Sequence, residues 1–332
     1  MSDEKKHEDE KPKTITFVEE MPVVTEHEIK IGSKTLKYKA TTGRMPFKNE
    51  FDEIEAQVFY MAYTVESDSP AKRPLMFSFN GGPGSPSVWL HLGALGPKRV
   101  RMTEDDQFPP PPHELVDNEF TWLEHCDLVF IDPVNTGFSR AKTKEISDKH
   151  LGVQGDIESV SEFIRLYISR NERWASPLYL VGESYGTLRS AGISGYLIDR
   201  GIAFNGIILV SSILNYQTAR FTKGNDLPYV LFLPTYAATA HYHGVIPKRK
   251  NLRAFLKEVE RFAIGEYASL LAQGDSISSA TRKATIQKLA RYTGLRPDFI
   301  DQSNLRINIH NFCKELLRTR KRTVGRIDSR FV

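Results

Sequence analysis

The chain has 332 residues, enough for one large domain or two of ordinary size. Its 40% hydrophobic and 26% charged residues are typical of a globular protein and exclude a disordered or collagen-like chain. The formal net charge of +4 is too small to make nucleic acid or an anionic membrane the expected partner. With only two cysteines, Cys126 and Cys313, the sequence predicts neither a disulfide framework nor a metal site.

Residues 1–14 are almost all charged, and we expect them to form a disordered tail. They lack the apolar segment of a secretory signal. No apolar run in the sequence approaches the ~18 residues that a membrane span needs. We therefore expect a cytoplasmic protein without a membrane partner.

The first two-thirds of the sequence alternates strand and helix patterns, which predicts an α/β fold. Alternating polarity from Glu28 to Tyr38 predicts a hairpin that turns at Gly32. Apolar residues at helical spacing from Ile157 to Tyr167 predict a helix, with Asp156 as its N-cap. Further strands are expected at Ile54–Thr64, Pro74–Phe79, Asp127–Ile131, Pro177–Val181 and Ile207–Val210.

Beyond Ser211 the pattern becomes helical. No strand-like run follows before the last residue, Val332. Amphipathic helices are expected at Leu252–Ala263, Ala280–Tyr292 and Ile309–Leu317.

Residues 182–186, GESYG, lie between an expected strand and a helix expected to start near Thr187. This G-x-S-x-G pattern is typical of a nucleophile elbow, where flanking glycines permit a strained turn that presents the serine above the sheet. The N-terminus of the following helix favours developing negative charge. A turn of small residues is the alternative. We interpret Ser184 as the candidate nucleophile.

Residues 80–85, NGGPGS, follow another expected strand. In α/β-hydrolases a glycine-rich loop after an early strand supplies one oxyanion donor, and the residue after the nucleophile supplies the other. Gly82 and Tyr185 occupy these positions. A phosphate-binding loop is a rival interpretation, but the patterns G-K-[ST] and G-x-G-x-x-G are absent. A tight turn is the simpler alternative.

Together with IDPVNTGFSR at residues 131–140, these two motifs resemble the signature blocks of the serine carboxypeptidase family, peptidase family S10, in its bacterial form. The resemblance runs from about Val23 to the C-terminus. It implies an α/β-hydrolase fold, with a mostly parallel central sheet and an inserted helical cap. It also implies that Ser184 is acylated and that the amides of Gly82 and Tyr185 form the oxyanion hole.

The resemblance further implies that Asn80, the Gly81 amide and Glu183 bind the terminal carboxylate of the substrate. A protonated Glu183 can donate a hydrogen bond to that carboxylate, which implies activity at acidic pH; a solvated or paired Glu183 is the alternative. Secreted members carry a tryptophan and an acidic residue where this sequence has Ser78 and Ala94. These departures weaken the expectation of strict exopeptidase specificity.

The acid and the histidine of a catalytic triad are not found. In this fold they follow the serine, on loops after later strands. Only the strand at residues 207–210 is expected after Ser184, and His241, His243 and His310 lie in helical surroundings. We therefore expect a core that is incomplete at the C-terminus.

We interpret the chain as a charged tail (1–14), an α/β-hydrolase core with the nucleophile elbow (15–222) and a helical cap region (223–332) without the final strands. The predicted function is a serine carboxypeptidase-like hydrolase that releases C-terminal residues from peptides through an acyl-enzyme on Ser184. An acyltransferase or esterase on the same scaffold, or an inactive binding module, are the alternatives. No cofactor is expected; a peptide with a free C-terminus is the expected partner, and an oligomer is left open.

Overall fold

The structure, a computed structural model, describes residues 16–103 and 109–332. It separates into two compact units, one up to Leu214 and one from Asn215 to Val332. We call them the core unit and the helical unit and describe each by itself. The division falls eight residues before the boundary expected at 222/223 (222 − 214). The tail expected at residues 1–14 lies outside the described residues.

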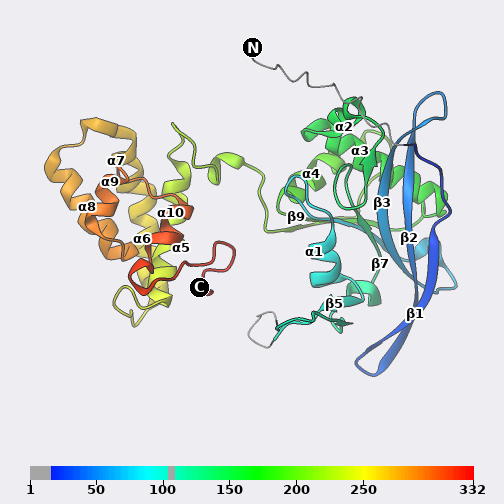
Figure 1. Ribbon diagram of the computed structural model, residues 1–332, viewed down its shortest axis with the longest axis horizontal. Coiled ribbons are helices and arrows are strands. Elements are labelled where there is room, and N and C mark those ends of the chain that lie inside the picture. The colour runs from blue at the N-terminus through cyan, green and yellow to red at the C-terminus, as the bar shows by residue number, and fades with distance from the viewer. Residues whose placement is uncertain (1–15, 104–108) are drawn as a thin grey trace, which may run out of the picture. The chain divides into compact units, whose positions relative to one another are not determined.

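The core unit is built on an eight-stranded mixed sheet in the order β1-β2-β3-β7-β4-β9-β10, with β8 paired to β3 (Figure 1). Strands β7, β4, β9 and β10 run parallel, whereas β1, β2, β3 and β7 pair antiparallel in sequence. The strands are β1 (Val23–Ile31), β2 (Lys34–Lys48), β3 (Ile54–Val65), β4 (Leu75–Phe79), β7 (Asp127–Ile131), β8 (Arg140–Ala141), β9 (Leu178–Glu183) and β10 (Gly206–Val210).

The expected parallel strands are confirmed to within two residues at each end. The hairpin expected at Glu28–Tyr38 is longer in both arms, because β2 continues past the hairpin to pair with β3. A small antiparallel pair, β5 (Lys98–Val100) and β6 (Leu115–Asp117), was not expected. Strands of three residues are too short to show a period in the sequence.

Side chains of the central strands alternate between two faces of the sheet. Phe77 and Phe79 of β4 belong to a core that includes Phe163 of α3 (Val153–Arg170) and Ile193 of α4 (Tyr185–Ile198). Met76 points into the other core, with residues of the segments α1 and η2. The remaining helical segments of the unit are η1 (Pro70–Lys72), α1 (Val88–Leu90), η2 (His91–Leu95), η3 (Trp122–Glu124) and α2 (Lys144–His150).

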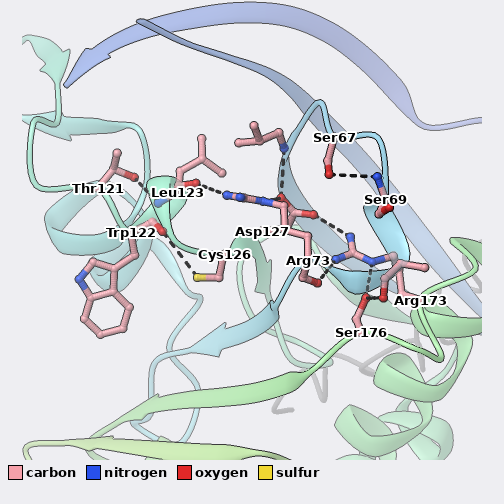
Figure 2. A network of polar contacts seen from close by, with 12 residues as sticks. Ser67, Ser69, Arg73, Thr121, Trp122, Leu123, Cys126, Asp127, Arg173 and Ser176 are labelled. Carbon is pink, nitrogen blue, oxygen red and sulfur yellow. Dashed lines mark hydrogen bonds and ion pairs between the residues drawn. The ribbon is translucent and has the colours of Figure 1, made fainter. Parts of the chain in front are cut away.

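At the starts of the parallel strands, Asp127 anchors a buried network of polar contacts (Figure 2). Its carboxylate accepts hydrogen bonds from Arg73 Nε at 2.8 Å, from Arg173 Nη1 at 2.7 Å and from the backbone of Val65 at 3.1 Å. Arg173 also donates to Ser176 Oγ and to the Arg73 carbonyl, at 2.7 and 2.8 Å. The network therefore satisfies buried charges and the chain segments that enter β4 and β9.

One helix start differs from expectation. Asp156 is not the N-cap of α3: the helix begins at Val153 after Gly152, whose φ of 98° suits a glycine. Asp156 lies inside the first turn, buried and ion-paired to Arg189. A negative charge in the first turn is favoured by the helix dipole as well as at the cap, so the sequence alone did not separate the two positions.

The helical unit has its own core, in which the rings of Tyr236 and Phe312 stack at 4.0 Å. Three helices were expected and are present; α5 was not expected, because it is apolar on all sides and contains Pro234. The helices are α5 (Leu227–Tyr242), α6 (Leu252–Phe262), α7 (Ala268–Gln273), α8 (Ser279–Thr293), α9 (Pro297–Gln302) and α10 (Ile309–Glu315), with the short segments η4 (Tyr216–Thr218), η5 (Ala263–Tyr267), η6 (Gly274–Ser276) and η7 (Arg318–Arg320).

Candidate active site

Ser184 lies in a strained turn between β9 and α4, with φ 57° and ψ −122°. Such a conformation costs a residue with a Cβ on the order of 1–3 kcal/mol, which the surrounding structure must offset. The turn is closed tightly, since a Cβ on Gly182 would lie 2.1 Å from the carbonyl oxygen of Gly186. Thr187 Oγ1 donates to the Ser184 carbonyl at 2.7 Å. Helix α4 starts at Tyr185, two residues earlier than expected, so Ser184 is its N-cap residue.

The glycine-rich loop after β4 packs directly against this elbow. A Cβ on Gly81 would lie 2.4 Å from Tyr185 N and 2.7 Å from Glu183 O, so only glycine allows the two backbones to approach this closely. The Gly81 carbonyl accepts a hydrogen bond from Ser85 N at 3.1 Å, which closes the loop. The backbones of the two predicted oxyanion segments are therefore adjacent in the core unit.

Asn80 joins the loop to the elbow through its side chain, which is buried. Its Oδ1 accepts a hydrogen bond from Leu90 N at 3.0 Å, and this contact orients the amide so that Nδ2 donates to Glu183 Oε2, also at 3.0 Å. Glu183 itself is partly exposed. The structure thus brings together the two side chains that were predicted to bind a substrate carboxylate.

Behind the loop, Arg189 of α4 forms a buried ion pair with Asp156 of α3. The guanidinium donates to both carboxylate oxygens, Nε to Oδ2 at 2.7 Å and Nη2 to Oδ1 at 3.0 Å. Its third hydrogen bond runs from Nη1 to the carbonyl oxygen of Asn80 at 2.7 Å. The guanidinium carbon lies 5.1 Å from the ring centroids of both Phe79 and Tyr185.

The third sequence block, residues 131–140, supports the glycine-rich loop from the side. Asp132 Oδ1 accepts a hydrogen bond from Ser87 N at 2.9 Å, and Oδ2 accepts one from Phe138 N at 3.4 Å. Burial raises the pKa of Asp132, while the two backbone donors act to lower it. Ser139 Oγ donates to the Asp132 carbonyl at 2.6 Å and accepts from Phe59 N at 2.8 Å. The block therefore connects the loop after β4 to β3.

A cavity of about 360 Å³ adjoins these groups in the core unit. Pro83, Gly84 and Tyr185 form one side, and Asp156 and Arg189 also line it. The other lining residues come from two loops, residues 133–136 and 150–153, and are mostly apolar. The cavity is thus lined by both predicted oxyanion segments, and Ser184 is not among its lining residues.

No hydrogen bond joins Ser184 to a histidine within residues 16–103 and 109–332. His241 Nε2 accepts from Arg249 N at 3.0 Å, and His243 Nε2 lies 2.7 Å from Ser329 O, so both rings have partners inside the helical unit. In the core unit, the ring of His91 lies 2.6 Å from the hydroxyl of Tyr63, and burial lowers its pKa to about 4. The described part of the chain contains no group of His, Cys, Asp and Glu placed to hold a metal ion. None of its helices is both long and apolar enough to span a bilayer.

A serine at a strained strand-to-helix turn, above parallel strands and beside a glycine-rich loop, defines an α/β-hydrolase fold. The family model for serine carboxypeptidases matches residues 32–322, and the chain belongs to this family, peptidase S10.

Curated relatives include serine carboxypeptidase-like 33 of Arabidopsis thaliana, 28% identical over 185 residues that cover 54% of this chain and 35% of the relative. A pheromone-processing carboxypeptidase of Tuber melanosporum is 35% identical over 123 residues, 36% of this chain and 18% of the relative. The chain spans about a third of the length of the first curated relatives it matches. A solved prohormone-processing carboxypeptidase from Saccharomyces cerevisiae aligns at a TM-score of 0.45 and 20% identity, over 77% of this chain and 53% of that one.

Three residues of this region were not predicted to act near the site: Asp132, Asp156 and Arg189. Asp132 lies in a motif that was noted only for its resemblance, and Asp156 was interpreted as a helix cap. Arg189 carries a signal of its own, because it is the only charged residue of α4 and a charge within an apolar helix requires a partner.

Proposed function

We propose that this chain carries the nucleophile and the substrate-carboxylate site of a serine carboxypeptidase. Ser184 attacks the carbonyl of the last peptide bond, the amides of Gly82 and Tyr185 stabilise the oxyanion, and water hydrolyses the acyl-enzyme. The observation that carries the proposal is the close packing of Gly81 against Tyr185 N beside the strained Ser184. This packing holds the two predicted oxyanion segments side by side before substrate binds.

The contacts of Asn80 support exopeptidase action. Its Nδ2 is oriented by the Leu90 amide and reaches Glu183, so both side chains converge on one place beside the nucleophile. A protonated Glu183 donates a hydrogen bond to a carboxylate, whereas an ionised one repels it. A peptide with a free C-terminus is therefore the proposed substrate, and the helical unit is proposed to be the cap region of the fold.

A second candidate is an esterase or acyltransferase that uses the same serine. It is favoured by the side chains at the two positions where the sequence departs from the secreted relatives. The Ser78 hydroxyl is buried without a hydrogen-bond partner in the described structure, and Ala94 supplies no carboxyl group. A site that binds the substrate carboxylate through fewer groups accepts esters more readily.

The test uses the full chain with three matched substrates: an N-blocked dipeptide, its C-terminal amide and its methyl ester. A fluorophosphonate probe and mass spectrometry report whether Ser184 is the labelled residue, with Ser184→Ala as the control. We expect labelling of Ser184 and hydrolysis of the free-acid peptide in preference to the amide. Preferred cleavage of the ester supports the second candidate, and no labelling with no hydrolysis indicates an inactive binding module.

A further inference from the structure

Arg189 has more contacts than an ion pair requires. Its side chain is 1% exposed, and three of its nitrogens donate hydrogen bonds, two to Asp156 and one to the carbonyl oxygen of Asn80. Two charges removed from water are costly to bury, and an apolar pair of similar size often gives a protein equal or greater stability. Stability alone therefore gives a weak explanation for this arrangement.

The bond to Asn80 has a direct consequence for the next residue. The peptide bond between Asn80 and Gly81 is trans, so its C=O and N–H point in opposite directions. When Arg189 holds the carbonyl oxygen on the side of α3 and α4, the Gly81 N–H must point away from these helices. Gly81 is the residue whose amide is predicted to bind the substrate carboxylate.

The same guanidinium also lies against the ring of Tyr185, whose amide is the other predicted oxyanion donor. The Asn80 carbonyl packs closely on the first turn of α4, since a Cβ on Gly186 would lie 3.1 Å from its oxygen. This packing leaves little room for the peptide to rotate. Arg189 therefore contacts both segments that frame the proposed site without being part of the reacting groups.

We propose that Arg189, oriented by Asp156, is a positioning residue that fixes the Asn80–Gly81 peptide and thereby gives the site its preference for a C-terminal carboxylate. This inference rests on the proposed function. Hydrogen bonds to a charged group are about twice as strong as those to a neutral one, so a misdirected Gly81 N–H weakens binding of an acid more than binding of an amide.

The Arg173–Asp127 pair provides a matched control within the core unit (Figure 2). Arg173 is also buried, also pairs with an aspartate at 2.7 Å and also donates to a backbone carbonyl, that of Arg73, at 2.8 Å. It lies at the starts of the strands, whereas Asn80 and Ser184 follow their ends. A role in stability alone predicts the same consequences for both pairs.

The experiment compares Arg189→Lys, the double variant Asp156→Leu/Arg189→Met and the control Arg173→Met with the parent chain. The double variant leaves neither charge unpaired, which favours its folding. Calorimetry measures binding of N-acetylphenylalanine and of its C-terminal amide, and kinetics measures kcat and KM for the free-acid peptide and its methyl ester. Crystal structures of the parent and of Arg189→Lys show the orientation of the Asn80–Gly81 peptide.

We expect the preference for acid over amide to fall about tenfold in the double variant, with a smaller fall in Arg189→Lys, and to persist in Arg173→Met. The loss should affect KM for the free-acid peptide and leave KM for the ester almost unchanged. An unchanged acid preference in a folded double variant overturns the proposal, as does an equal loss in the Arg173→Met control.

A parent chain that neither hydrolyses the substrates nor prefers the acid refutes the proposed function. The crystal structures then decide the positioning role separately. A peptide that rotates in Arg189→Lys supports the role. A peptide that keeps its orientation, although the substituted side chain no longer contacts the Asn80 carbonyl, refutes it.

Discussion

The close approach of the glycine-rich loop to the elbow can be tested by Gly81→Ala. The new Cβ would lie 2.4 Å from Tyr185 N, 2.7 Å from Glu183 O and 2.8 Å from Gly186 N. All three neighbours are backbone atoms, so no side chain can rotate away to make space. The loop or the elbow must move, and overpacking of this kind costs about 1–3 kcal/mol.

Two measurements follow from this displacement. At roughly 2–4 °C per kcal/mol for a unit of this size, the melting temperature should fall by about 2–12 °C. Because the loop carries the predicted oxyanion donor Gly82, the rate of fluorophosphonate labelling at Ser184 should fall by up to about 10²–10³-fold, the cost of losing one such donor. Calorimetry and timed mass spectrometry provide the two values.

Gly195→Ala on α4 is the control for this substitution. A Cβ there meets nothing within 4 Å, and alanine in a helix is favoured over glycine by about 0.5–1 kcal/mol. We expect this variant to melt slightly higher and to be labelled at the parent rate. A Gly81→Ala variant with the parent melting temperature and labelling rate would contradict the described packing of loop and elbow.

Three further predictions concern stability. Ser184→Gly should raise the free energy of unfolding by about 1 kcal/mol in urea titrations, because glycine tolerates φ 57°, whereas Ser184→Ala should leave it unchanged. His91 has a folded pKa of about 4 against an ordinary 6.5, so the unfolded chain binds its proton first and stability should decline as pH falls from about 6.5 to about 4, by up to about 3 kcal/mol. Urea titrations across this range should show a shallower decline for His91→Gln. Asp132→Ala should cost about 1–3 kcal/mol and speed hydrogen exchange at the Ser87 amide, which loses its acceptor.

The central sheet could be predicted from the sequence because its parallel strands are buried on both faces. Such strands are short, continuous apolar runs, as at Asp127–Ile131, and nothing in their surroundings competes with that signal. The elbow could be predicted for a similar reason, since its glycines are required by backbone contacts that only the strand-to-helix turn makes. Local sequence and tertiary structure agree at these places.

Other features depend on contacts that no local pattern encodes. Helix α5 has apolar residues on all sides and an internal proline, so its sequence lacks the helical period. The partner of Arg189 lies 33 residues away along the chain, and its third acceptor is a carbonyl 109 residues away. A charge in an apolar helix indicates that partners exist, but their identity follows only from the packing of α3 and α4 behind the loop.

The two buried arginine–aspartate pairs differ in the segments to which they connect. At the strand starts, Arg173 donates to the carbonyl of Arg73, in the segment that leads into β4. At the strand ends, Arg189 donates to the carbonyl of Asn80, where the chain has left β4 to form the glycine-rich loop. A peptide inside a sheet is already oriented by its ladder, whereas a peptide in a loop has no such constraint. A buried charge that holds a loop carbonyl therefore supplies the orientation that the sheet cannot, at the place where the proposed mechanism needs a fixed N–H.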